Sequence, residues 1–130
     1  MPNEELAKFY SGSKVCLNLH RGLLGTDLAS DEQVKPEETW SLGPRAYEIA
    51  ACGGFQIAQA GMGELEEVFG DTVPVFETGE EMEAFARFAV HHDDLRAQTA
   101  HLQRRAARPC TFERRAKDIV LPILEAGLRR

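Results

Sequence analysis

The chain has 130 residues, the size of one domain with one hydrophobic core. Apolar residues make up 43% and charged residues 28%, which is typical of a globular domain and excludes a disordered chain. The formal charge of −6 argues against a nucleic-acid partner, because such proteins carry a basic patch. No apolar run approaches the roughly 20 residues that a membrane-spanning helix needs.

The chain contains three cysteines, Cys16, Cys52 and Cys110, which stand far apart. Their odd number and wide spacing predict neither a disulfide framework nor a C-x-x-C metal site. No charged segment followed by an apolar one opens the chain, so no secretory signal is expected. We therefore expect a reducing, cytoplasmic setting.

The first third of the chain predicts a helix, a strand and a long connection. Asn3 is suited to cap a helix over residues 3–11. The nearly continuous apolar run over residues 14–19 predicts a buried strand. A connection from His20 to Leu42 follows, and connections of this length in compact domains are usually functional or mobile.

The middle of the chain alternates between helices and strands. Pro44 suits the first turn of a helix over residues 44–52, which Gly53 and Gly54 end. Strands are expected over residues 55–58 and 73–76, with a short helix over 64–69 between them. Pro74 cannot donate a ladder hydrogen bond, so the later strand is expected at a sheet edge.

Three helices are expected to end the chain. Thr78 and Glu81 have the spacing of a capping box, and the helix that they begin places Met82, Phe85, Phe88 and Ala89 on one face. The next helix covers about residues 93–107 and ends before Pro109. Thr111 caps the last, which should kink upstream of Pro122 and turn five apolar residues inward: Phe112, Ala116, Ile119, Val120 and Ile123.

This order predicts an α/β fold. Strands that alternate with helices form a parallel sheet joined by crossover connections. We expect one domain over residues 1–130, with a small three-stranded parallel sheet flanked by helices and extra helices at the C-terminus.

The beginning of the helix at residue 44 carries the clearest functional signal. A helix N-terminus presents N–H groups and partial positive charge to a phosphate, and Gly43, Pro44 and Arg45 lie there. Glu48, three residues further, has a carboxylate that can accept hydrogen bonds from two ribose hydroxyls. The alternative is a surface ion pair between Arg45 and Glu48.

Two other groups of residues have a structural alternative. His20 follows the first strand and is a candidate general base, although an ordinary loop histidine fits as well. The run H-H-D-D over residues 91–94 suggests a metal site, but adjacent residues on a helix point apart and a polar helix junction is favoured. No catalytic residue and no metal site are assigned.

Several segments together resemble the CgeB-like, spore-maturation-type glycosyltransferases. They are K-V-C-L-N-L-H-R at residue 14, R-A-Y-E-I-A-A-C-G-G-F at 45, E-L-E-E-V-F at 64 and R-A-A-R-P-C-T-F-E-R-R-A at 105. The resemblance implies the C-terminal, donor-binding part of a GT-B enzyme, which consists of two Rossmann-like domains. It also implies a nucleotide sugar as donor and no cofactor.

By motif position, the resemblance implies roles for six residues. Glu48 would hold the ribose, and Gly43, Pro44 and Arg45 would lie near the diphosphate. His20 and Arg21 would lie at the carboxyl edge of the sheet, where such sheets bind ligands.

The sequence departs from this family pattern in two ways. Many retaining relatives have a second glutamate eight positions before the ribose-binding one, where this chain has Trp40. The match also covers only the later half of a donor domain, so we expect the isolated chain to transfer no sugar. The open strand edge at residues 14–19 should be covered in a homodimer or by a partner chain. The alternative function is a non-catalytic, self-assembling interaction module.

Overall fold

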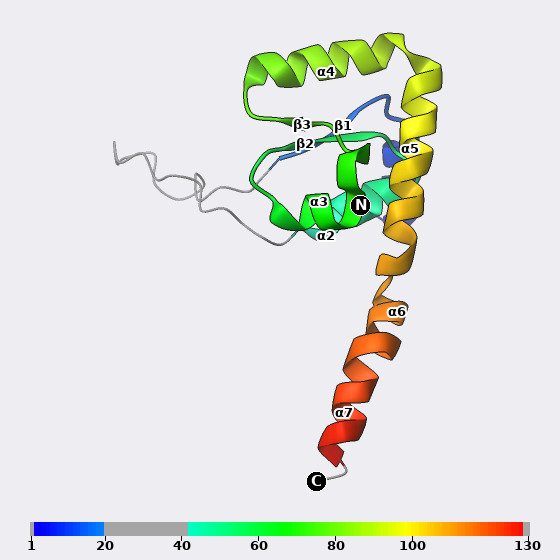
Figure 1. Ribbon diagram of the computed structural model, residues 1–130. Helices are drawn as coiled ribbons and strands as arrows, with labels where there is room; N and C mark the ends of the chain where they lie inside the picture. The colour runs from blue at the N-terminus through cyan, green and yellow to red at the C-terminus, as the bar shows by residue number, and fades with distance from the viewer. Residues whose placement is uncertain (1, 20–41, 129–130) are drawn as a thin grey trace, which may run out of the picture.

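The computed structural model describes residues 2–19 and 42–128 (Figure 1). Its first elements are helix α1 (Asn3–Gly12), strand β1 (Cys16–Asn18), helix α2 (Pro44–Ala51), strand β2 (Gln56–Gln59), helix α3 (Gly63–Phe69), the 3₁₀ turn η1 (Gly70–Thr72) and strand β3 (Val75–Phe76). The rest is helical: α4 (Gly79–His91), α5 (Asp93–Ala107), η2 (Arg108–Cys110), α6 (Phe112–Arg115), the π-helical turn η3 (Ala116–Val120) and α7 (Leu121–Leu128).

The three strands form one parallel sheet in the order β1-β2-β3. Leu17 pairs with Ile57, and Ala58 pairs with Val75. The predicted fold class is confirmed, and the arrangement is consistent with half of a Rossmann-like domain. Strand β3, which follows Pro74, lies at an edge as that proline predicts.

Helices cover both faces of the sheet. Figure 1 shows α4 on one side of the strands and α2 and α3 on the other, while α5 runs past the sheet from one side to the other. Two clusters of buried side chains match these layers. Ala58 of β2 packs with α2 and α3, and Ile57, on the opposite face, packs with Ala89 of α4 and Ala100 of α5.

Both helix caps predicted from threonines are confirmed. The hydroxyl of Thr78 accepts a hydrogen bond from the backbone N–H of Glu81, and that of Thr111 accepts one from Arg114. The carboxylate of Glu81 accepts from the N–H of Glu77, one residue before the cap, so the capping box closes one position early.

Two predictions about the first elements are wrong. Pro2, not Asn3, is the N-cap of α1, since Asn3 already has a place in the helix. The strand predicted over residues 14–19 is shorter in the structure, where β1 covers Cys16–Asn18. Burial alternates along this segment: Cys16 and Asn18 are buried, whereas Leu17 and Leu19 are exposed. This alternation arises because β1 is an edge strand with one face of the sheet left open around it.

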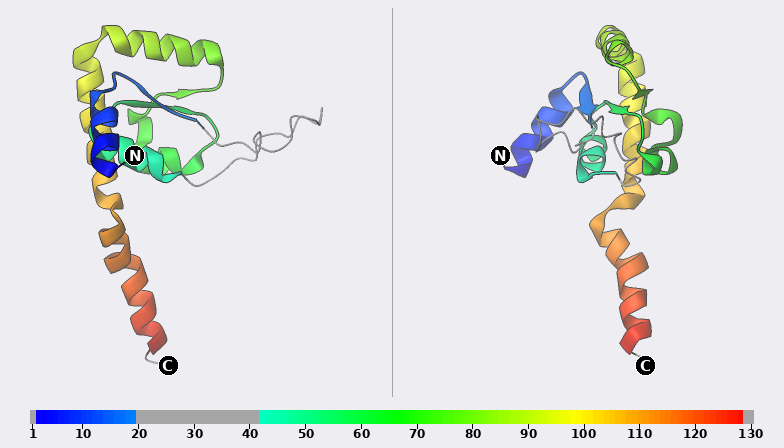
Figure 2. Two further views of the ribbon diagram at one scale, coloured as in Figure 1. Left: turned by 180° about the vertical axis from the view of Figure 1, so that it is seen from behind. Right: turned by 90° about the vertical axis from the view of Figure 1, so that its left-hand side faces the viewer.

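The prediction that the last helix turns its apolar side chains inward is also wrong. Phe112, Ile119, Val120 and Ile123 are exposed, and no residue of α6, η3 or α7 is buried. The reason is spatial, because these elements extend away from the sheet (Figures 1 and 2). The π-helical turn lies just upstream of Pro122, where the missing proline N–H predicts an irregularity.

Gly54 allows the end of α1 to approach the turn between α2 and β2. A Cβ atom on Gly54 would lie 2.8 Å from the carbonyl oxygen of Tyr10 and 3.0 Å from Cγ2 of Ile49. We expect Gly54→Ala to lower the free energy of unfolding by about 2 kcal/mol, the cost of overpacking a rigid site. Urea denaturation measures this effect. Gly12→Ala is the control, since its Cβ meets nothing within 4 Å, and equal loss in both variants would contradict the prediction.

Candidate functional site

The carboxyl edge of the sheet brings together the segments that the sequence singled out. Because β1 and β2 are parallel, helix α2, which connects back from one to the other, begins at the edge where both strands end. Gly43, the N-cap of α2, and Pro44, its first residue, therefore lie at this edge with the end of β1 and the loop that follows β2.

Glu64, in the first turn of α3, ties the beginning of α2 to that helix. Its two carboxylate oxygens accept hydrogen bonds from the N–H of Leu42 at 2.7 Å and from the hydroxyl of Tyr47 at 2.6 Å. Arg115 donates to the Tyr47 hydroxyl at 3.2 Å and lies 3.6 Å from the Glu64 carboxylate. These contacts hold the N-terminal end of α2 against α3 at the carboxyl edge of the sheet.

The environment of Tyr47 keeps it protonated. Burial, followed by the hydrogen bond to Glu64, raises the pKa of Tyr47 to about 12. Its hydroxyl is therefore a hydrogen-bond donor throughout the neutral range, and it donates to Glu64 rather than acting as a base. We assign Tyr47 and Glu64 a positioning role.

A cavity of 670 Å³ opens beside this edge, between the loop after β2, helix α3 and strand β3. Its lining includes Gly61 of the loop, Gly63 at the beginning of α3, and the polar side chains of Gln59, Glu66 and Asp71. Gly61 has φ of 99°, a conformation that side chains with a Cβ rarely adopt. The loop thus presents backbone and polar side chains together to a space large enough for a small ligand.

Arg45 and Glu48 are exposed on the outer face of α2. Within the described residues no ion pair joins them, so the structure does not have the surface salt bridge that was the alternative interpretation. The pKa of Tyr10 is raised by burial first and by the Glu48 carboxylate second, whereas Arg45 lowers it. Both charged groups are thus near enough to Tyr10 of α1 to affect its pKa, and neither lines the 670 Å³ cavity.

The remaining candidates divide into two groups. His20, Arg21 and Trp40 lie outside the described residues. His92 and Asp93 have structural contacts instead: the His92 ring stacks on Phe88 with centroids 3.9 Å apart, and Asp93 pairs with Arg96 at 2.6 Å. Among the residues that the structure describes, no three His, Cys, Asp or Glu side chains gather closely enough to bind one metal ion.

The residues that line the cavity were not predicted from the sequence. Gly61 and Gly63 were not singled out from the sequence, although glycines just after a parallel strand can mark a place where a ligand approaches the backbone. Glu66 and Asp71 gave no signal, because their approach to the loop depends on how α3 and η1 pack.

The fold and this edge define an α/β unit of the Rossmann-like class. The model of the glycosyl transferase-like family matches residues 1–120, and the chain belongs to this family. Comparisons with curated proteins and with solved structures found no match. No helix in residues 2–19 and 42–128 combines the length and apolar character needed to cross a membrane.

Proposed function

We propose that this chain is the nucleotide-sugar-binding part of a CgeB-like glycosyltransferase of the GT-B type. One observation carries the proposal: a family match over residues 1–120 coincides with a helix N-terminus at the carboxyl edge of a parallel sheet. A glycosyltransferase donor has a diphosphate, and the first-turn N–H groups and positive end of a helix bind such a group.

The role proposed for each residue depends on how far it lies from the N-terminus of α2. The backbone at Gly43, Pro44 and Arg45 lies at the helix N-terminus, and the Arg45 guanidinium is free of carboxylate partners among the described ion pairs. These groups hold the diphosphate. Glu48, one turn further and exposed, accepts hydrogen bonds from the ribose hydroxyls. His20 and Arg21 follow β1 in the sequence and belong to the same edge.

The isolated chain is proposed to bind the donor without transferring sugar. Transfer requires donor and acceptor in one closed, water-poor cleft, and a GT-B cleft forms between two domains. A partner chain covers the edge of β1, where Leu17 and Leu19 are exposed. The three widely spaced cysteines favour a cytoplasmic location.

Thermal unfolding with added donors tests this function. A nucleotide sugar at ten times its Kd should add about 1.4 kcal/mol of stability, which raises Tm by about 5 °C. UDP-, GDP- and TDP-sugars are compared with the free sugars as controls, and one nucleotide series should raise Tm. If no nucleotide changes Tm at millimolar concentration, donor binding by this chain is ruled out.

The second candidate is a non-catalytic, self-assembling interaction module. The exposed apolar side chains of α6, η3 and α7 favour it, because such surfaces mark contacts with other chains. This candidate predicts self-association with no response to any nucleotide, so the thermal experiment separates it from donor binding.

A further inference from the structure

The C-terminal elements form an apolar arm, defined as residues 112–128. Every residue of this arm is exposed, and Phe112 and Leu128 keep 86% and 87% of their surface in solvent. Its large apolar residues are Phe112, Ile119, Val120, Leu121, Ile123, Leu124 and Leu128. An exposed helix with this many large apolar side chains is an interaction surface.

The arm has a fixed starting point and direction. Near its start, Arg115 donates to Tyr47, and its guanidinium carbon lies 5.2 Å from the centre of the Tyr47 ring. From there the arm leaves the end of α5 that is opposite to α4, as the views of Figures 1 and 2 agree. It therefore extends away from its own α4.

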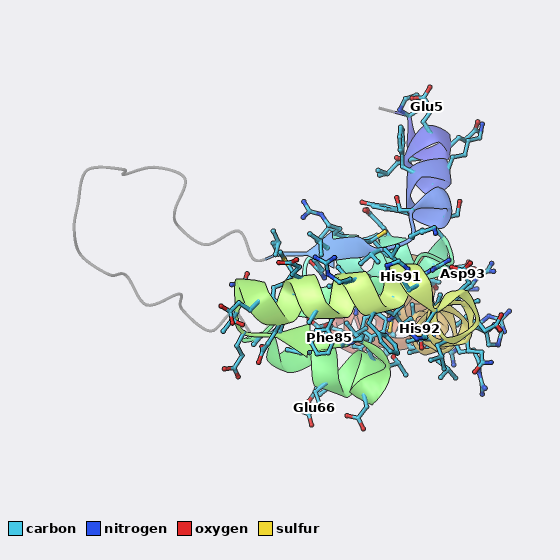
Figure 3. All side chains as sticks on the ribbon, turned by 90° about the horizontal axis from the view of Figure 1, so that it is seen from above. Glu5, Glu66, Phe85, His91, His92 and Asp93 are labelled. Carbon is cyan, nitrogen blue, oxygen red and sulfur yellow. The ribbon has the colours of Figure 1, made fainter. Side chains whose placement is uncertain are left out.

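An apolar groove lies at the other end of α5, in the corner between α4 and α5. This groove has a volume of 510 Å³, and Phe85, Phe88, Leu95 and Thr99 are among its lining residues. Phe85, Phe88 and Leu95 are all exposed. Figure 3 shows Phe85 on α4 and His92 at the turn into α5. The corner itself is stabilised by Arg96, which donates to the carbonyl of Ala89 at 2.7 Å and pairs with Asp93.

The lengths of the arm and of α5 match. At about 1.5 Å per residue, residues 112–128 span about 25 Å and the 15 residues of α5 span about 22 Å. An arm that runs antiparallel along the α5 of a second copy therefore reaches the groove. On the way it meets Leu102 and Leu95, which are exposed and seven residues apart on one face of α5.

The charges of the arm and of the α4–α5 corner are complementary. Residues 108–130 contain six of the 15 lysines and arginines but only three of the 21 acidic residues. Residues 77–94, which form α4 and the corner, contain six acidic residues and one arginine. Opposite charge steers such surfaces together and disfavours the pairing of an arm with another arm.

We propose that the arm of one chain packs along α5 and into the α4–α5 groove of a second copy, and that the second copy does the same in return. The occupant is a second copy because each chain carries both surfaces and its own arm points away from its own groove. Since each chain gives an arm and receives one, the contact closes as a two-fold dimer.

Sedimentation equilibrium on the full chain tests this arrangement. The wild type should be a dimer at micromolar concentration. Leu124→Glu, in the arm, and Phe88→Glu, in the groove, should each weaken self-association by at least about tenfold. Both side chains are exposed, so circular dichroism should show that each variant keeps the wild-type fold. Glu125→Gln, on the arm, is the matched control and should leave the dimer intact.

An equimolar mixture of the two variants makes the test specific. The Phe88→Glu chain has an intact arm and the Leu124→Glu chain has an intact groove, so the mixture should form heterodimers although each variant alone is monomeric. A monomeric wild type overturns the proposal. A Phe88→Glu variant that dimerises as strongly as the wild type also overturns it. Such a dimer would form through a contact outside the groove, such as arm against arm or β1 edge against β1 edge.

Discussion

Replacing Gln103 by methionine is expected to lower the free energy of unfolding by about 3–4 kcal/mol. Gln103 is fully buried, and its amide oxygen accepts from the N–H of Gln56 at 3.0 Å. Its amide nitrogen donates to the carbonyls of Gln56 at 3.1 Å and of Thr72 at 2.8 Å. Methionine fills similar space but leaves these backbone groups without partners, and each costs about 1–3 kcal/mol when unsatisfied.

The position of Gln103 in the sheet explains why this effect should be large. The N–H groups of Ala58 and Ala60 donate to the carbonyls of Pro74 and Phe76 of the β3 segment. The N–H of Gln56, two residues before Ala58, has the same orientation but lies beyond the reach of β3. The Gln103 side-chain amide therefore takes the place of a neighbouring strand. Its oxygen accepts from the N–H of Gln56, and its nitrogen donates to the carbonyl of Gln56.

Urea denaturation gives the measurement, with the midpoint and the m-value determined together. Gln98→Met is the matched control, because Gln98 lies on the same helix and is exposed. It should change stability by less than about 0.5 kcal/mol. If Gln103→Met is as stable as this control, the amide does not contribute to the sheet in the way described.

Local signals predicted most of the element boundaries. Pro44 and Thr78 mark the beginnings of α2 and α4, and the helix expected over residues 93–107 is α5. These signals are reliable because a cap or a proline acts on the backbone within one turn. The order of the strands then follows, since short crossovers place consecutive parallel strands side by side.

Long-range contacts were not predictable from one sequence. The hydrogen bonds between Gln103 and Gln56 join residues 47 positions apart, and no local pattern distinguishes Gln103 from an exposed glutamine. Glu64 similarly appeared as one of several acidic residues on a short helix. For the C-terminal arm, the pattern identified an apolar face, but periodicity does not show what that face packs against.

Glu48→Ala is expected to weaken binding of the nucleotide sugar by about 10- to 150-fold, the effect of losing hydrogen bonds of about 1.5–3 kcal/mol to a charged group. Stability should change by less than about 0.5 kcal/mol, because Glu48 is exposed and has no ion-pair partner among the described residues. Calorimetric titration with the donor that raises Tm measures the change in Kd.

Two variants give this prediction its controls. Glu67→Ala removes an exposed glutamate from α3 that does not line the cavity, and it should bind the donor as the wild type does. Arg45→Ala should weaken the binding of the nucleoside diphosphate and of the nucleotide sugar to the same extent, because Arg45 is proposed to contact the phosphates. Equal binding by Glu48→Ala and the wild type would remove the ribose role from Glu48.

Donor binding by this chain depends on contacts between the diphosphate and the beginning of α2. Two-dimensional ¹H–¹⁵N NMR of the full chain during titration with the nucleoside diphosphate locates these contacts. We expect the largest shifts at the backbone amides of residues 43 and 45–48, with smaller shifts over residues 60–63. Shifts confined to α4 and α5, with the amides at the beginning of α2 unchanged, would contradict this expectation.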